Sequence, residues 1–142
     1  GFPYACADTT FHGVPNISVV RIEEDPFTVG DIEFLPLPVM HHKLPVLGFR
    51  VGDFAYITDA NHIPKETWSK LSGVKVLVIN ALRKTDHLSH FTLSQAIDIA
   101  RELDAEKTYL THISHQMGKH ADVSQDLPNG VEIAHDGLKI SI

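Results

Sequence analysis

The sequence predicts an α/β domain, and three observations support this fold class. Short apolar runs bounded by Gly, Pro, Asn and Asp indicate strands. Two other segments carry the end signals of helices, and one of them also places its apolar residues at helical spacing. With 43% hydrophobic and 21% charged residues, the chain can form a core and does not resemble a disordered segment. Its 142 residues contain no repeat or low-complexity linker, so a single domain over 1–142 is expected.

The strands are justified by the apolar runs and by the turn signals between them. Three turn signals separate neighbouring runs and predict hairpins: Gly30-Asp31, Gly52-Asp53 and Asp136-Gly137. The run over 32–40 contains Pro36 and Pro38, which exclude a helix and indicate an extended edge or strand end. Strands are therefore expected at 17–22, 27–29, 32–40, 46–51, 54–58, 74–79, 107–111, 131–134 and 138–142, after an irregular or edge segment at 1–16.

The helices are justified by their end signals. A short helix is predicted with Pro64 near its first turn and Gly73 just past its end. The segment TLSQ at 92–95 resembles a capping box, and the apolar residues that follow it fall at helical spacing. We therefore expect a helix over 93–103, and a third helix near 116–126.

Composition excludes several classes of protein. Twelve Lys+Arg against eighteen Asp+Glu give a net charge of −6, which argues against binding nucleic acid through bulk charge. No apolar stretch approaches the ~20 residues that span a bilayer, and the chain lacks a basic-then-apolar secretory start. Its single cysteine, Cys6, excludes an internal disulfide and fits a reducing compartment. A cytoplasmic protein without membrane partners is expected.

Ligand-type side chains follow four of the predicted strands. They are His41 and His42, Asp59, Asn80, and His112, and the loops beyond carry Asp86, His87, His90, His115 and His120. Taken singly, each is more readily interpreted as a surface or core residue, and Asp59 as a turn cap. Four strand ends of this kind together indicate a site, because sheets build sites at the carboxyl ends of their strands. His62 and His135 lack such placement and are expected to be structural.

These residue types indicate metal chemistry. Two neutral imidazoles and a carboxylate suit Zn²⁺, Mn²⁺ or Fe²⁺, and a carboxylate can bridge two cations. A further histidine without a metal would be free to move a proton. The sequence contains no GxSxG elbow, Gly-rich phosphate loop or CxxC pair.

Three segments carry a family resemblance: PLPVMHHKLPVLGFRVGDFAYITDA, VLVINALRKTDHLSHFTLSQAIDIARELDAEKTYLTHISHQMGKH and AHDGLKI. From about residue 32 to the C-terminus, the chain resembles the second half of the metallo-β-lactamase superfamily. The most similar branch is that of the phosphoribosyl cyclic phosphodiesterases and their tRNA 3′-end-processing relatives. The resemblance implies an αββα sandwich with a dinuclear metal site, of which this chain forms the C-terminal half.

The resemblance also implies roles for individual residues. His41 would complete the ligand set of one metal, Asp59 would bridge the two ions, and His112 would bind the second. His90 would donate the proton to the leaving group. His87 and His115 would lie beside the ligands or in the substrate pocket. The ions would be Zn²⁺ or Mn²⁺, with Fe²⁺ as a further option, and a hydroxide held by them would attack phosphorus.

The family motif His-x-His-x-Asp-His is missing from this sequence. We therefore expect a fragment of a longer enzyme or a truncated homologue, nearly inactive alone and weak in metal binding. It is expected to self-associate or to pair with the missing N-terminal half. The function expected of the intact protein is metal-dependent hydrolysis of a small phosphodiester or nucleotide-like substrate, with nucleic acid a less favoured one. The alternatives are a non-catalytic binding or regulatory module and a mononuclear site of two histidines and one carboxylate.

Overall fold

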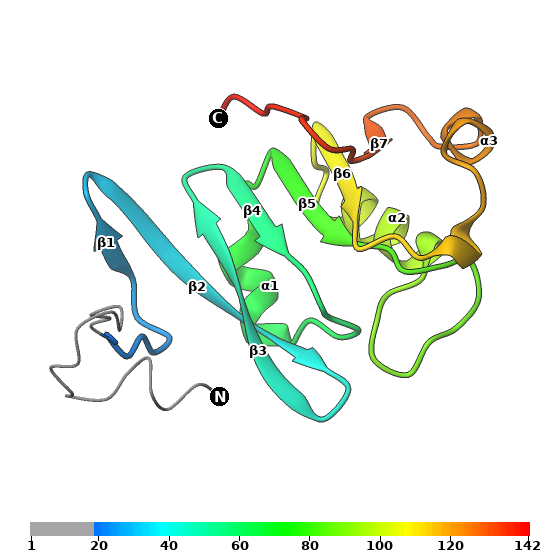
Figure 1. The fold of residues 1–142 in the computed structure, drawn as a ribbon. Coiled ribbons are helices and arrows are strands. Elements are labelled where there is room, and N and C mark those ends of the chain that lie inside the picture. The colour runs from blue at the N-terminus through cyan, green and yellow to red at the C-terminus, as the bar shows by residue number, and fades with distance from the viewer. Residues whose placement is uncertain (1–18) are drawn as a thin grey trace, which may run out of the picture.

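A computed structural model of the chain describes residues 19–142, so the irregular start expected at 1–16 lies outside the described residues. Its strands form one seven-stranded sheet in chain order (Figure 1). The strands are β1 (Phe27–Val29), β2 (Ile32–His41), β3 (Leu44–Val51), β4 (Phe54–Ile57), β5 (Val76–Asn80), β6 (Lys107–Thr111) and β7 (Val131–Ile133). The mixed α/β fold predicted from the sequence is confirmed.

The directions of the strands determine which ends meet. Neighbouring strands from β1 to β4 pair antiparallel, and neighbouring strands from β4 to β7 pair parallel. Since β2 and β4 are both antiparallel to β3, β2 runs the same way as β4, β5 and β6. The carboxyl ends of these four strands therefore lie along one edge of the sheet, where the ligand-type residues were expected to gather.

The two prolines of β2 lie where the strand has an open edge. β1 pairs with β2 only as far as Phe34, whereas β3 pairs along the other side through His41. On the open side, Thr67 donates a hydrogen bond to the carbonyl of Pro38, and the Lys70 ammonium lies 3.4 Å from the carbonyl of Pro36. The missing proline N–H groups therefore cost β2 no strand pairing. The extended conformation predicted for this run is confirmed, although β2 lies between β1 and β3 in the sheet.

Helices α1 (Lys65–Leu71) and α2 (Leu93–Glu102) lie on the same face of the sheet (Figure 1). Between them and the strands lies the core, which includes Leu37, Ile57, Leu71, Leu77, Ile79, Ala96 and Leu110. The predicted capping box is confirmed, because Thr92 and Gln95 exchange side-chain and backbone hydrogen bonds. A short 3₁₀ helix, η2 (His115–Met117), and α3 (His120–Gln125) occupy the region where a third helix was expected.

The other face of the sheet carries a row of large side chains. The pairing places Phe49 opposite Tyr56, Tyr56 beside Val78, and Val78 beside Tyr109. Because side chains alternate between the two faces of a strand, this row points away from α1 and α2. Tyr56 is 40% exposed. We call Phe49, Tyr56, Val78 and Tyr109 the aromatic row.

Two predicted elements differ from the structure. No strand forms over 19–22 of the predicted 17–22, where Val19 and Val20 are largely exposed and no described strand pairs with them. The predicted terminal hairpin is also wrong: β7 pairs parallel with β6, and 138–142 is not a strand. In both cases the local pattern fits a strand, but a strand also needs a partner edge.

None of the helices in residues 19–142 is long and apolar enough to cross a bilayer.

Candidate metal centre

Two residues of the site lie just beyond parallel strands in an unusual backbone conformation. Asp59 follows the end of β4 and His112 directly follows β6, and their φ angles are 54° and 57°. A residue with a side chain rarely adopts this left-handed region, because its Cβ crowds the backbone. Such strain is common at functional sites, where the surrounding structure maintains it. Here it turns both residues out of their strands at the same edge of the sheet.

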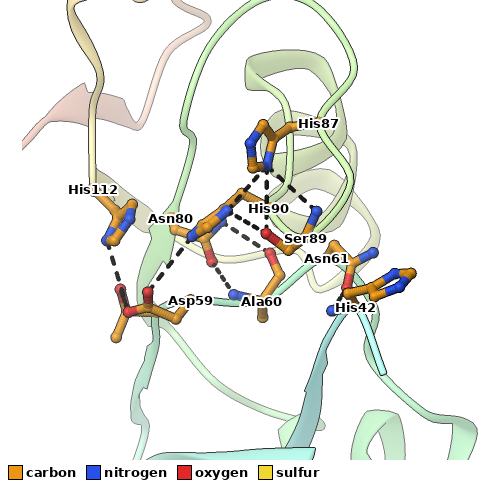
Figure 2. Close-up of polar contacts among 10 residues, drawn as sticks. His42, Asp59, Ala60, Asn61, Asn80, His87, Ser89, His90 and His112 are labelled. Atoms are coloured by element: carbon orange, nitrogen blue, oxygen red, sulfur yellow. Dashed lines mark hydrogen bonds and ion pairs between the residues drawn. The ribbon is translucent and has the colours of Figure 1, made fainter. Parts of the chain in front are cut away.

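The backbone next to Asp59 is fixed by a buried amide. The Asn80 side chain, at the end of β5, accepts a hydrogen bond from the N–H of Ala60 and donates one to its carbonyl, both at 2.9 Å. The N–H of Phe91 also donates to the carbonyl of Ala60, at 2.8 Å. Because Ala60 follows Asp59 and Phe91 follows His90, these bonds bring the two site residues side by side (Figure 2).

The carboxylate of Asp59 lies between two imidazoles. Its Oδ1 is 3.5 Å from Nε2 of His90, and its Oδ2 is 3.7 Å from Nδ1 of His112. The hydroxyl of Thr58 donates a hydrogen bond to Oδ2. One ligand atom from each of His41, Asp59 and His90 lies within 4.8 Å of the others. One carboxylate therefore faces separate nitrogen donors with each of its oxygens (Figure 2).

His90 is the centre of a group of four imidazole rings. Its ring centroid is 4.8 Å from that of His41, 5.0 Å from that of His87 and 4.7 Å from that of His112. Its side chain is buried, and Nε2 has no hydrogen-bond partner among the described residues, although Oδ1 of Asp59 lies 3.5 Å away. An unpaired buried nitrogen is costly unless something binds it.

Burial lowers the pKa of the His90 imidazole below its ordinary 6.5. The neighbouring imidazoles of His112, His41 and His87 lower this pKa further, and the Asp59 carboxylate opposes them. The ring is therefore neutral at pH 7, which is the form that binds metal ions. Neutral imidazoles around one carboxylate, with an orphaned nitrogen among them, form a donor set that fits a divalent transition metal.

The structure brings most of the predicted site residues together. His41, Asp59, His90 and His112 converge, although the tightest grouping contains His90 in place of His112. His87 contacts the cluster, with its Nδ1 at 3.1 Å from Nδ1 of His90. His115 begins η2 and is exposed, and no hydrogen bond, ion pair or ring contact among residues 19–142 joins it to the cluster.

Some positioning residues were not identified from the sequence. Asn61 follows Ala60 and accepts a hydrogen bond from the N–H of His42 while donating one to the carbonyl of Leu88. Arg83 donates to the carbonyl of Asp86 and to the side chain of Gln116, so it links the loop before His87 to η2. Nothing in the local sequence distinguishes Asn61 or Arg83 from an ordinary loop residue. The sequence places Asn80 at a strand end, but it does not predict the two hydrogen bonds of its side chain to the Ala60 backbone.

Comparison with known proteins agrees with this geometry. The model of the family described as "Beta-lactamase superfamily domain" matches residues 1–113. A crystal structure described as a new diphosphatase from the PhnP family is 37% identical, with a TM-score of 0.83 over 87% of this chain and 48% of that one. Human tRNase Z, short form, shares the fold with 21% identity and a TM-score of 0.60, over 82% of this chain and 45% of its own.

A curated relative is the octanoyltransferase of Porphyromonas gingivalis (strain ATCC BAA-308 / W83), which is 33% identical over 141 residues. The match covers 98% of this chain but 29% of the octanoyltransferase, so the chain spans less than half the length of this relative and of the diphosphatase. The family match covers most of the chain, and the sheet, helices and histidine-rich edge agree with it. The chain therefore belongs to the β-lactamase superfamily domain family and has the fold of the second half of the metallo-β-lactamase sandwich.

Proposed function

We propose that this chain is the C-terminal half of the catalytic domain of a metal-dependent phosphodiesterase. The observation that carries the proposal is the position of Asp59, whose two carboxylate oxygens face His90 and His112 separately. Burial lowers the pKa of His90, which disfavours a simple ion pair between His90 and Asp59, and the His112 side chain is 37% exposed. A carboxylate and imidazole nitrogens that face one another in this way can bind a cation between them.

His41, Asp59 and His112 would hold the metal, with Asp59 bridging two ions. A divalent cation at this position supplies positive charge that polarises a phosphoryl oxygen and activates water for attack. The retained donors in this chain are fewer than a dinuclear site needs, so the rest of the ligand set belongs to the other half of the domain. We expect Zn²⁺, which imidazole suits, or Mn²⁺, which carboxylate suits.

His90 would act as the proton donor to the leaving group. Its buried Nε2 points at Asp59, and its Nδ1 lies 3.0 Å from the Ser89 hydroxyl and 3.1 Å from Nδ1 of His87. These neighbours hold the ring orientation and can return a proton to it. A general acid must be protonated before it can donate, and the Asp59 carboxylate favours the protonated form of His90, whereas burial and the neighbouring imidazoles oppose it. His87 supports His90 by holding its ring orientation.

The substrate class is inferred from relatives. The diphosphatase of the PhnP family is 37% identical to this chain over the part where the two align, which favours a small phosphodiester or nucleotide-like substrate. The net charge of −6 makes a nucleic acid a less favoured substrate.

The other half of the sandwich would cover the aromatic row. Half-exposed aromatic side chains on one sheet face are a surface that proteins normally bury. This chain spans 48% of the diphosphatase, so a second sheet of comparable size is available in a protein of that length. Without it, the chain would self-associate through the same face.

The alternative is a non-catalytic homologue that keeps the scaffold to bind a partner. This alternative is not favoured, because a binding module has no need of four converging imidazoles or of a strained Asp59.

The test is metal content and turnover of the whole protein. Asp59→Ala should lose bound metal, measured by elemental analysis, together with hydrolysis of bis(p-nitrophenyl) phosphate. His90→Ala should keep its metal while turnover falls about 10²–10⁴-fold, the range for losing a general acid. Loss of metal in His90→Ala would make His90 a ligand. A wild-type protein with full metal content and no phosphodiesterase activity would contradict the proposal.

A further inference from the structure

The side chain of Asn61 joins two segments of the site that have different roles in the proposed reaction. Its Oδ1 accepts a hydrogen bond from the N–H of His42 at 2.7 Å (Figure 2). Its Nδ2 donates one to the carbonyl of Leu88 at 3.1 Å. His42 directly follows His41, and Leu88 lies two residues before His90. One amide therefore holds both the segment of a proposed metal ligand and the segment of the proposed proton donor.

The first bond holds a strained turn. His42 is the first residue of the two-residue turn between β2 and β3, and its φ is 57°. This left-handed region is unfavourable for a residue with a side chain, because the Cβ crowds the backbone. The N–H of Asn61 also donates to the carbonyl of Met40 at 2.9 Å, so Asn61 bonds to the backbone on both sides of His41. The direction in which His41 leaves β2 is therefore fixed from outside the histidine cluster.

The second bond holds the loop that carries His90. Residues 84–90 form no helix or strand. In the described part of the chain, the Leu88 carbonyl is their only backbone group with a hydrogen bond to a residue beyond the neighbouring Arg83. The next residue, Ser89, places its hydroxyl 3.0 Å from Nδ1 of His90. A shift at Leu88 therefore moves Ser89 and changes the orientation of the His90 ring.

An amide suits both partners at once. Its oxygen accepts and its nitrogen donates, whereas an ionised carboxylate only accepts and an alkyl group does neither. The two partners are an N–H and a carbonyl of the backbone, so each end of the amide has one partner that it can satisfy. The two bonds of Asn61 can therefore be removed separately by substitution.

We propose that Asn61 is a positioning residue with two separate effects. Its Oδ1 supports metal binding through the turn after His41, and its Nδ2 supports proton donation through the loop before His90. This inference rests on the proposed function, because it assigns a positioning residue to that site. Both effects act through backbone that Asn61 bonds to, so neither requires Asn61 to contact the metal or the substrate.

The first experiment measures metal binding by the whole protein, as competition for Zn²⁺ with a fluorescent chelator. Asn61→Ala removes both side-chain bonds and should weaken Zn²⁺ binding about tenfold, the upper end of what one hydrogen bond contributes. Asn61→Asp keeps the acceptor for the His42 N–H and should not weaken binding. Adding His42→Gly to Asn61→Ala should restore most of the affinity, because glycine adopts a positive φ without strain. Asn129→Ala and Asn129→Asp, at an exposed position, are matched controls and should leave the affinity unchanged.

The second experiment measures proton donation at saturating Zn²⁺, with methyl p-nitrophenyl phosphate and methyl phenyl phosphate as substrates. Phenolate is the poorer leaving group, so its departure depends more on a proton donor. Asn61→Asp should lower kcat for the phenyl ester several-fold more than for the nitrophenyl ester, which is the pattern expected of His90→Ala. Asn61→Ala with His42→Gly should show the same pattern despite its restored Zn²⁺ affinity. A general structural loss would lower kcat for both esters equally.

The inference would be overturned by unchanged Zn²⁺ affinity in Asn61→Ala, by affinity that His42→Gly does not restore, or by equal loss for the two esters in Asn61→Asp. If Asn61→Ala does not fold, Asn61→Asp decides alone. Weakened Zn²⁺ binding or an equal loss for both esters in that variant would then overturn the inference.

Failure of the proposed function gives a different result. A whole protein that binds Zn²⁺ and hydrolyses neither ester would reject the phosphodiesterase. In that protein, Zn²⁺ affinity still tests the Oδ1 bond, and amide hydrogen exchange tests the Nδ2 bond. Asn61→Asp should speed exchange over 84–91 and leave it unchanged over 41–44, whereas unchanged exchange over 84–91 would overturn the role of the Leu88 bond. Hydrolysis of both esters without the two separate effects would reject only the role of Asn61.

Discussion

The side-chain amide of Asn80 forms two hydrogen bonds with the backbone of a single residue, Ala60, donating to its carbonyl and accepting from its N–H. Asn80 is fully buried, so neither bond competes with water. Through Ala60 the amide controls the chain directly after Asp59, which is held in a left-handed conformation. A residue at the end of β5 thus keeps a site residue at the end of β4 in place.

Replacing Asn80 should damage both stability and metal binding. Asn80→Ala leaves the Ala60 N–H without its partner in a buried position, which costs about 2–3 kcal/mol of unfolding free energy. Asp59 would then relax, and metal affinity should fall. Urea unfolding and a metal titration measure the two effects. Asn129→Ala, at an exposed position, is the control and should change neither.

The stability of the metal-free protein should depend on pH through His90. Its pKa is lowered in the folded state, so the unfolded chain binds more protons at pH values between the lowered pKa and about 6.5. The free energy of unfolding should therefore fall as the pH drops below 6.5. His90→Gln removes this group and should flatten the profile in that range. An equally steep profile in the variant would show that another group is responsible. Urea unfolding in EDTA at several pH values measures the effect.

The capping box of α2 gives a prediction about stability alone. Thr92→Ala removes the side-chain oxygen that accepts from the Gln95 N–H, and should cost about 1 kcal/mol. Because α2 packs on a face of the sheet and the site lies at its edge, metal content should stay at the wild-type value. Thermal unfolding and elemental analysis check both parts, and the exposed Ser141→Ala serves as the control. A loss of metal would mean that the helix start also positions His90.

Gly48 should tolerate no side chain. A Cβ at this position would lie 2.7 Å from the backbone carbonyl oxygen of Tyr56 in the adjacent strand β4. Backbone cannot yield as a flexible side chain does, so Gly48→Ala should cost about 1–3 kcal/mol through overpacking. Gly30→Ala is a useful comparison, because it has free space but a φ of +60°. A smaller loss in Gly48→Ala than in Gly30→Ala would contradict the close approach.

The aromatic row predicts the assembly state of the 142-residue chain. Without a second sheet, the chain should elute as an oligomer in size-exclusion chromatography with light scattering. Tyr56→Lys introduces a charge on that face and should shift the chain toward monomer. Val29→Lys, at an exposed position on β1, is the control. A stable wild-type monomer would contradict this expectation.

Much of the fold was predictable because its signals are local. Turn residues at Gly52 and the capping box at Thr92 determine a hairpin and a helix start within four residues of sequence. The convergence of His41, Asp59 and His112 was also predictable, since each follows an apolar run and the carboxyl ends of strands are where sites form.

The rest depends on partners that are distant in sequence. Whether 17–22 or 138–142 becomes a strand is decided by the presence of a neighbouring edge, which periodicity does not report. The hydrogen bonds of Asn61 reach residues 19 and 27 positions away, and no pattern of neighbours predicts them. The left-handed φ of Asp59 and His112 is likewise a product of that tertiary framework.

Asn61 joins the turn after β2 to the loop before His90, because it bonds to the backbone of His42 and of Leu88, and it also bonds to Met40, the residue before His41. The two segments that carry His41 and His90 are therefore linked outside the histidine cluster itself. The exposed side chains of Leu44 and Leu88 take no part in these bonds. In descendants of this protein, substitutions should therefore accumulate at Leu44 and Leu88 sooner than at Asn61.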